Sequence, residues 1–297
     1  MNHLERFQFG IPALDECLGG GVLPGTLTVV AGATGIGKTQ LGLHFARQGL
    51  RQEGRAGIVF DMSTRGDSQN HTGYAGRLFG WELSALDAAR HVSPESMWQP
   101  GFQPADYLHL FDQSGRRVTR ADLEFDDWRA WKLELARKLT TCIFFFYSNF
   151  VAGVRRAVID GVEPAERPSE SIQFDLFDYI YHQILRKDAD WVARDLFREH
   201  YRVNAERVAA HPYRPGEVAC LLLYTTREVM LEDLIGRPLD QGDVLSNANT
   251  VLYLGKLREG NRLGRALYVA KHRGSYCHDG LVPFEIGDEG LLVKETG

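Results

Sequence analysis

The sequence predicts an α/β fold in which a mostly parallel central sheet is flanked by helices and carries antiparallel strands at its C-terminal edge. Two observations favour this fold class. Short apolar, β-branched runs alternate with segments of helical periodicity along most of the 297 residues, as in strand–helix–strand units. From residue 250 onward, short strand-like runs instead follow one another directly, which predicts strands that close the sheet.

The expected elements begin around a glycine-rich turn. Residues 12–18 have the proline and the apolar spacing of a short helix, which ends at the three glycines of residues 19–21. A Pro-Gly turn then leads into an apolar strand at residues 27–31. Further apolar runs predict strands at 56–61, 107–112, 157–160, 220–226, 250–257, 264–271, 281–286 and 291–293. Helical spacing predicts helices from residue 40, around 74–81, over 126–154, and one or two over 171–209.

The domain organisation is expected to be simple. No repeat, low-complexity block or long linker divides the sequence, which predicts a single domain over residues 1–297. Residues 83–106 and 161–216 are polar and contain prolines. We therefore expect these two segments to be insertions or mobile loops.

Residues 32–39 read GATGIGKT and match the pattern G-x-x-x-x-G-K-[ST] of a phosphate-binding loop (P-loop). The expected strand precedes the pattern and the expected helix follows it, which is the context that the motif requires. Glycines let backbone N–H groups face phosphate oxygens, and the helix N-terminus adds its positive dipole end. Lys38 would reach the β- and γ-phosphates, and the Thr39 hydroxyl would bind Mg²⁺. The predicted ligands are thus ATP and Mg²⁺, with nucleotide contacts at Gly32, Ala33, Thr34, Gly35, Ile36, Gly37, Lys38, Thr39 and Gln40.

Carboxylates at strand ends complete the predicted site. Mg²⁺ at a P-loop needs an acid at the end of a neighbouring buried strand, and Asp160 follows such an apolar run. We therefore predict Asp160 as the metal-side acid beside Thr39, with Asp112 as the alternative. Hydrolysis also needs a group that orients or deprotonates water, and Asp61 ends the strand at 56–61. Asp61 is well placed for this role if its strand neighbours the P-loop strand.

Composition narrows the class of protein. The net charge of −5 disfavours a broad nucleic-acid-binding surface. Four scattered cysteines without a C-x-x-C pair disfavour a disulfide framework or a metal site and fit a reducing compartment. The N-terminus has no signal-peptide pattern, and the most apolar stretch, 141–147, is too short to span a bilayer. We therefore expect a cytoplasmic protein without a membrane span.

Five separated motifs, in order, resemble the KaiC-like branch of the RecA superfamily of ATPases. FGIPALD followed by LGGG and PG is similar to the opening motif of that family, and LFGWEL is similar to its L-G-W-D-L. LYTTRE resembles the strand end L-x-T-T-x-E, KHRGS resembles K-x-R-G-S, and a nearby HD completes the set. These motifs lie at residues 9–25, 78–83, 223–228, 271–275 and 278–279. The resemblance covers about half of the chain.

The resemblance implies a RecA-like ATPase that assembles as a ring, usually a hexamer, with ATP between subunits. Lys38 would act within one subunit, whereas Lys271 and Arg273 would reach the γ-phosphate of the neighbouring subunit, as an arginine finger does. It further implies a nucleotide-dependent switch that acts on a protein partner in signalling or regulation. The family has paired glutamates where this chain has Asp61-Met62, so the expected ATPase is slow.

Two alternatives share this fold. A DNA-dependent recombinase or helicase relative would need basic loops, but the loop after Asp160 carries three glutamates against one arginine. Nucleic acid is therefore not the expected partner. A non-hydrolysing, nucleotide-gated scaffold is the other alternative, because Asp61 is one methylene shorter than glutamate.

Overall fold

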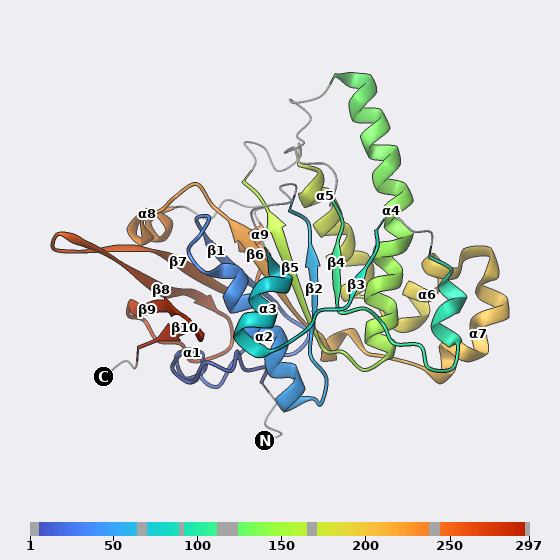
Figure 1. The fold of residues 1–297 in the computed structure, drawn as a ribbon, viewed down its shortest axis with the longest axis horizontal. Helices are drawn as coiled ribbons and strands as arrows, with labels where there is room; N and C mark the ends of the chain where they lie inside the picture. Colours follow the sequence, from blue (N-terminus) through green and yellow to red (C-terminus); the bar gives the residue numbers. More distant parts are fainter. Residues whose placement is uncertain are drawn as a thin grey trace.

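A ten-stranded sheet forms the centre of the molecule in a computed structural model that describes residues 6–63, 70–88, 92–111, 124–164, 171–237 and 244–294. The strand order is β10-β9-β8-β7-β1-β6-β5-β2-β4-β3 (Figure 1). The strands are β1 (Leu27–Gly32), β2 (Ile58–Asp61), β3 (Ala85–Leu86), β4 (Tyr107–His109), β5 (Arg156–Val162), β6 (Ala219–Thr225), β7 (Thr250–Glu259), β8 (Arg262–His272), β9 (Val282–Gly287) and β10 (Gly290–Val293).

The strand directions confirm the predicted fold class. β1 pairs in parallel with β6 and β7, and β5, β2, β4 and β3 continue the parallel part of the sheet. β8, β9 and β10 are added antiparallel at the C-terminal edge. The last four strands are consecutive in sequence, and two-residue turns join β7 to β8 and β9 to β10, whereas residues 273–281 connect β8 to β9, so no crossover helix is needed.

Helices cover both faces of the sheet. The α-helices are α1 (Pro12–Cys17), α2 (Lys38–Gln52), α3 (His71–Phe79), α4 (Phe125–Val151), α5 (Ile172–Tyr179), α6 (Ala189–Phe197), α7 (Tyr201–Ala210), α8 (Leu231–Gly236) and α9 (Val244–Asn247). Residues of α1, α2 and α3 share one apolar cluster with one side of the strands, and residues of α4, α5, α6, α8 and α9 share a second cluster with the other side. The alternation of side chains along β1 explains this division, because Val29 belongs to one cluster and Val30 to the other.

Several boundaries differ from the prediction. β5 does not end at Asp160 but continues to Val162, with an irregular register between Ile159 and Val162. The segment 83–106 contains β3 and a 3₁₀ helix, Pro94–Trp98, whose Met97 is buried in the core, and its assignment as an insertion stays a prediction. Apolar residues of the segment 171–210 also belong to the core. Packing against the sheet thus orders polar segments that sequence periodicity alone does not resolve.

The sequence analysis assumed that the strands carrying the two acids neighbour the P-loop strand, and the strand order shows that they do not. Neither acid-bearing strand neighbours β1, because β6 lies between β1 and β5, and β2 lies beyond β5. The acids still reach the P-loop, since β5 and β2 pair in register with Asp160 opposite Asp61. Side chains at the ends of parallel strands converge on one edge even when a strand intervenes.

Candidate functional site

The P-loop connects β1 to α2, as the motif requires. Gly35 and Gly37 have φ angles of 76° and 117°, in the left-handed region that favours glycine. A Cβ at Gly32 would lie 2.3 Å from the Leu254 carbonyl oxygen, and one at Gly37 would lie 3.0 Å from Ile286 Cδ1. The glycines of the motif are therefore required both by backbone conformation and by close packing against the C-terminal strands.

Lys38 is the first residue of α2 and lies inside the loop, only 6% exposed. Its Nζ donates hydrogen bonds to the carbonyl oxygens of Gly32 and Ala33, each at 2.9 Å. Burial lowers the pKa of Lys38 to about 8, although the charge of Asp160 acts in the opposite direction. The ammonium group thus lies against the loop that the sequence assigns to phosphates.

Thr39 and Asp160, the two residues that the sequence analysis assigned to Mg²⁺, are in contact. The Thr39 hydroxyl donates a hydrogen bond to Asp160 Oδ2 at 2.8 Å, and the Gly161 N–H donates to Oδ1 at 2.7 Å. Asp160 is completely buried. Gly161 has a φ of 86°, and a Cβ there would lie 2.1 Å from the Ser63 nitrogen. Glycine therefore allows the ends of β5 and β2 to approach closely enough to place both acids at one edge.

Asp61 lies at the end of β2 and is also completely buried. Its Oδ1 accepts a hydrogen bond from the Ser63 N–H at 2.8 Å, and its Oδ2 accepts one from the Tyr107 hydroxyl at 3.1 Å. Burial alone would raise the pKa of Asp61, but the contacts with His71 outweigh it and lower the pKa to about 2. Asp61 is therefore held as a carboxylate with both oxygens engaged.

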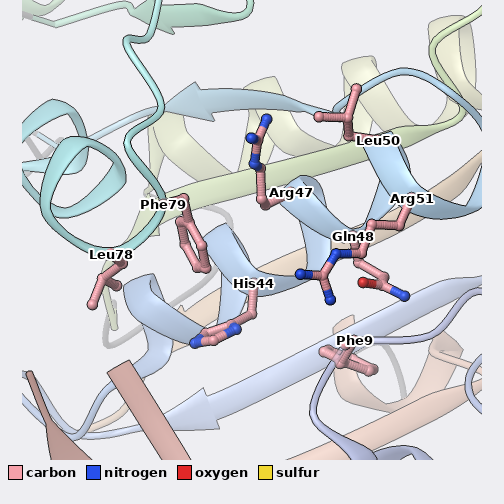
Figure 2. Close-up of a pocket in the computed structure, with 9 residues that line it drawn as sticks. Phe9, His44, Arg47, Gln48, Leu50, Arg51, Leu78 and Phe79 are labelled. Carbon is pink, nitrogen blue, oxygen red and sulfur yellow. The ribbon is translucent and has the colours of Figure 1, made fainter. Parts of the chain in front are cut away.

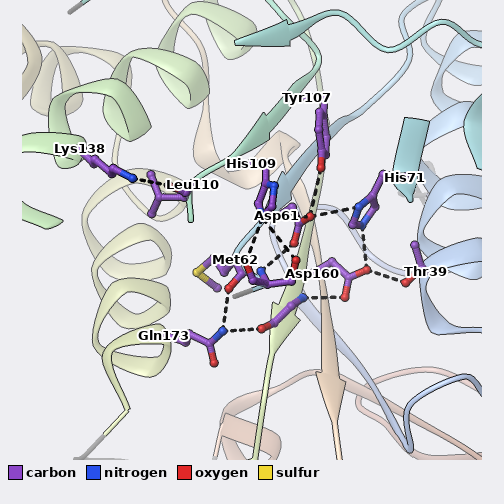
Figure 3. Close-up of polar contacts among 12 residues, drawn as sticks. Thr39, Asp61, Met62, His71, Tyr107, His109, Leu110, Lys138, Asp160 and Gln173 are labelled. Carbon is purple, nitrogen blue, oxygen red and sulfur yellow. Dashed lines mark hydrogen bonds and ion pairs between the residues drawn. The ribbon is translucent and has the colours of Figure 1, made fainter. Parts of the chain in front are cut away.

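His71 lies between the two acids, which the sequence analysis did not foresee (Figure 3). Its Nε2 is 3.0 Å from Asp160 Oδ2, and its Nδ1 is 3.3 Å from Asp61 Oδ2, an ion-pair contact without hydrogen-bond alignment. Burial would lower the pKa of His71, but the two carboxylates raise it to about 10. A single sequence offers no signal for this contact, because the histidine simply opens a helix after the strand.

Further side chains support the ends of the strands. Gln173, near the start of α5, donates from Nε2 to the carbonyl oxygens of Met62 and Gly161, both at 2.7 Å (Figure 3). His109 Nε2 lies 2.9 Å from the Ser63 carbonyl oxygen and 3.8 Å from Asp61 Oδ2. These contacts tie β2 to both β5 and β4, so the acids are fixed by three strands and two helices.

The donor set fits Mg²⁺ with a nucleotide. A hydroxyl and a carboxylate are hard oxygen ligands, and Mg²⁺ is usually held by one or two such groups together with substrate phosphates rather than by an all-protein cage. No group of three or more His, Cys, Asp or Glu arranged to hold a metal ion occurs in the part of the chain that the structure describes. The rival acid Asp112 lies outside the described residues.

Lys271 and Arg273 lie away from the P-loop of their own chain. Lys271 Nζ donates to the Ser246 carbonyl oxygen at 2.8 Å, and Arg273 Nη2 donates to the same oxygen at 3.3 Å. Lys271 lies at the end of β8 and Arg273 directly follows it, opposite Thr250 at the start of β7. The P-loop begins at the other end of the parallel strand β1. The structure therefore does not bring these two residues together with Lys38 or Asp61.

A separate cleft of about 420 Å³ opens on the outer side of α2 (Figure 2). Its lining includes Arg47 and Arg51 together with Phe79 of α3, and none of the predicted site residues. His44 also lines it, with Nε2 lacking a hydrogen-bond partner, and burial lowers the pKa of His44 to about 4.

Among the described residues, no helix combines the length and the apolar character needed to cross a membrane.

Comparison with known proteins finds similarity to one family. Residues 7–100 match the protein family described as "ATPase: KaiC". The chain is 22% identical over 300 residues to the circadian clock oscillator protein KaiC of Parasynechococcus marenigrum, and 24% identical over 297 residues to that of Prochlorococcus marinus. Each alignment covers 99% of this chain but 46% of the relative, so the chain spans less than half the length of the relatives that it matches.

A solved structure shows the same fold. The KaiC-like protein of the hyperthermophilic archaeon Pyrococcus horikoshii superposes with a TM-score of 0.53 at 18% identity, covering 98% of this chain and 99% of that one. The family match lies over the P-loop and the strand of Asp61, and the shared fold extends over the rest of the sheet. Together these findings show that the chain is similar to KaiC-like ATPases of the RecA superfamily, by sequence over residues 7–100 and by fold over nearly its whole length.

Proposed function

We propose that the chain binds ATP with Mg²⁺ at its P-loop, hydrolyses it slowly, and uses the nucleotide state to switch a surface recognised by a partner protein. One observation carries the proposal. The Thr39 hydroxyl and the Asp160 carboxylate, 121 positions apart in sequence, meet at 2.8 Å beside the P-loop. A hydroxyl and an acid in this arrangement are what a nucleotide-bound Mg²⁺ needs from a P-loop protein.

Each residue of the loop has a proposed part in binding. The backbone N–H groups of residues 33–40 bind phosphate oxygens, and Lys38 balances their charge. Thr39 and Asp160 hold the cation, which neutralises phosphate charge when bound. Lys38 gives up its two carbonyl contacts when phosphates enter, because a phosphate oxygen offers the ammonium group a stronger, charge-assisted hydrogen bond.

Asp61 is the proposed water-orienting residue. Its two oxygens already accept hydrogen bonds from Ser63 and Tyr107, and its pKa is near 2. Such a carboxylate can orient a water molecule but is a weak proton acceptor, which supports slow turnover. The same observation favours a second candidate function, a nucleotide-gated scaffold that binds ATP without hydrolysing it.

The last part of the proposal is that subunits assemble into a ring. We place Lys271 and Arg273 at the ATP of a neighbouring subunit in a ring, with a hexamer as the expected form. Support comes from their position at the opposite end of the sheet from their own P-loop. Thr28 and Gly32 are four positions apart along β1, which corresponds to about 13 Å. The pair can therefore act on a phosphate only across an interface.

The proposal also covers the domain organisation, the cellular location and the class of partner. We propose one ATPase domain over residues 1–297, in the cytoplasm, acting on a protein rather than on DNA. The sheet shared by β1 to β10 supports the first point, and the four cysteines, none of which forms a disulfide, support the second. The net charge of −5 supports the third. Part of the glutamate-rich loop after Asp160 lies outside the described residues.

A binding measurement tests the proposal. We expect the wild-type protein to bind a fluorescent ATP analogue in Mg²⁺, and Lys38→Ala to weaken binding at least about 100-fold, because a buried charge-assisted contact is lost. Lys187→Ala is the matched control, since that lysine lies over the Trp191 ring on α6. Equal affinity of the Lys38→Ala and wild-type proteins would exclude the P-loop as the nucleotide site. Phosphate release, measured with and without DNA, then separates a slow ATPase from a scaffold and from a DNA-dependent enzyme.

A further inference from the structure

The cleft on the outer side of α2 is lined by one stripe of that helix (Figure 2). The stripe consists of His44, Arg47, Gln48 and Arg51, whose spacing places them on the same face of α2. It rises about 10 Å along the helix axis. Apolar residues of α2 belong instead to the core cluster on this side of the sheet. The helix therefore buries one face against the sheet and leaves a polar stripe open to the cleft.

Two other segments form the walls of the cleft. Phe79 of α3 meets His44 edge-on, with ring centroids 4.9 Å apart, and Leu78 lines the same end (Figure 2). At the other end, the chain before α1 lies against the stripe, since a Cβ on Gly10 would lie 2.7 Å from Gln48 Oε1. The cleft thus has an apolar wall beside a polar stripe.

The charge of the cleft is positive. Its described lining contains Arg47 and Arg51 but no aspartate or glutamate. The Arg47 guanidinium lies 5.9 Å from the centre of the Trp81 ring. Within the part of the chain that the structure describes, neither arginine forms an ion pair, and Glu53, which directly follows α2, is bound by Arg156. Both guanidinium groups are therefore available to carboxylates of another molecule.

Positive charge beside apolar side chains defines the chemistry of the occupant. A small anion would pair with the arginines but leave uncovered the apolar wall and Leu50, which also lines the cleft and is 43% exposed. Nucleic acid would need more basic contacts than two arginines, on a chain of net charge −5. A peptide segment with carboxylates and an apolar side chain meets both requirements, because arginine and aromatic residues are favoured at protein interfaces.

The size of the cleft also fits a short segment of chain. Its volume of about 420 Å³ accommodates a few side chains rather than a folded domain. The stripe of about 10 Å corresponds to about three residues of an extended chain.

We propose that the cleft docks an acidic segment of a partner protein, whose carboxylates bind Arg47 and Arg51 while an apolar side chain packs against Phe79. Guanidinium and carboxylate groups pair through two parallel, charge-assisted hydrogen bonds, which gives such docking its geometry. The inference rests on the proposed function, because it names the surface that the nucleotide state would switch. Helix α2 connects the two sites, since its first turn carries Lys38 and Thr39 and its outer face lines the cleft.

The test is the binding of synthetic peptides without nucleotide, measured by fluorescence anisotropy at low ionic strength. The probe is a short fluorescein-labelled peptide in which glutamates alternate with leucine and phenylalanine. A second peptide has glutamine in place of each glutamate. We expect the wild-type protein to bind the acidic peptide at least about 10-fold more tightly, and the double variant Arg47→Gln with Arg51→Gln to lose this preference.

The matched control is the double variant Arg202→Gln with Arg207→Gln. It removes the same amount of charge from exposed positions of α7, which does not line the cleft. Its affinity for the acidic peptide should differ from that of the wild-type protein by less than about 2-fold, because distant charges are screened. Arg51→Gln alone removes an exposed side chain and should weaken binding about 3-fold or more, which keeps the test valid if the double variant at Arg47 and Arg51 does not fold.

Two further measurements separate docking from general attraction of acidic chains. A peptide with serine in place of leucine and phenylalanine should bind the wild-type protein at least about 5-fold more weakly than the acidic probe, because the apolar contact is lost. Lys38→Ala should bind the acidic probe as the wild-type protein does, since the cleft does not include the P-loop.

Four outcomes would overturn the proposal. They are equal binding of the acidic and glutamine peptides by the wild-type protein, a preference that survives loss of both cleft arginines, undiminished binding of the serine peptide, and loss of peptide binding in Lys38→Ala. Light scattering covers another occupant: if loss of the cleft arginines, and not of those on α7, reduces the size of the assembly, the cleft is an interface between copies of this chain. ATP affinity is measured separately, so a failure to bind ATP counts against the proposed function alone, and a failure to bind peptide against the docking site alone.

Discussion

The buried His71 and the partly buried His44 have opposite electrostatic surroundings. His71 lies between two carboxylates, which raise its pKa to about 10 against the effect of burial. His44 lies against the edge of the Phe79 ring, with its Nε2 lacking a hydrogen-bond partner, and burial lowers its pKa to about 4. The same side chain is therefore charged at one site and neutral at the other in neutral solution.

His44 should make the fold sensitive to acid. Its folded-state pKa lies below the value of 6.5 for an unperturbed histidine, so the unfolded state binds the proton more tightly. The stability that this difference provides is present above pH 6.5 and is lost as the pH falls toward 4. Between pH 6.5 and 4, the free energy of unfolding should therefore fall by on the order of 2 kcal/mol less in His44→Gln than in the wild-type protein. Urea unfolding at several pH values measures this difference.

His71 does not obscure that measurement. Its folded-state pKa is raised, so its contribution is complete below pH 6.5 and falls only as the pH rises toward 10. Between pH 6.5 and 4 it therefore adds no slope. Parallel stability curves for the wild-type protein and His44→Gln across this range would show that His44 is not buried as a neutral ring.

The sequence predicts the residues of the P-loop motif better than the residues that surround them in space. Lys38, Thr39 and Asp160 were assigned from spacing and strand context, and the structure brings the last two into contact. His71, Tyr107 and Gln173 were not assigned, because their roles depend on which strand ends meet in space. A motif fixes neighbours along the chain, whereas contacts across the sheet follow from strand order.

At the scale of elements, the long strand and helix patterns were predicted well and the strand order was not. The antiparallel tail was confirmed, because strands that are consecutive in sequence usually pair with one another. The place of β6 between β1 and β5 could not be read from periodicity, since any buried apolar strand fits any central position. Short elements such as β3 also carry too few residues to show a period.

Helix α2 packs unusually close to the sheet at one glycine. A Cβ at Gly42 would lie 2.8 Å from Leu223 Cδ1 and 2.9 Å from Val158 Cγ1. We expect Gly42→Ala to destabilise the fold by about 1–3 kcal/mol, because the methyl group would push α2 off β5 and β6. This loss should exceed the gain of roughly 1 kcal/mol from the better helix propensity of alanine.

Gly76 in α3 provides the matched control. It is exposed, and a Cβ there would meet no atom within 4 Å. Gly76→Ala should therefore stabilise the protein by about 0.5–1 kcal/mol, the opposite sign from the change in α2. Denaturant unfolding of both variants would measure the two effects. Stabilisation by both substitutions would mean that α2 can move away from the sheet at little cost.

At the scale of the whole molecule, the opposite placement of Arg273 and the P-loop leads to a test of assembly. If Arg273 acts across an interface, Arg273→Ala should bind ATP almost normally and lose about 10³-fold in hydrolysis rate. Mixing it with Lys38→Ala subunits should restore part of the activity, because some interfaces then carry one intact face from each parent. Activity of the mixture is compared with the sum of the separate proteins by phosphate release.

The dependence of activity on protein concentration can contradict a site shared between subunits. A composite site loses activity faster than in proportion to protein concentration once subunits dissociate. Wild-type turnover that stays proportional to protein concentration, in solutions shown to be monomeric by light scattering, would argue that each subunit hydrolyses ATP alone. Arg273 would then be a surface residue that binds the Ser246 carbonyl oxygen.

The central position of β1 also bears on how the chain is made. Its partners β6 and β7 begin at Ala219 and Thr250, so this apolar strand leaves the ribosome long before either neighbour exists. Pairing across such a distance is slow, and an unpaired strand invites association with other chains. Nascent chains should therefore need protection by chaperones until β7 emerges, and the ability to bind ATP should arise abruptly and late in synthesis.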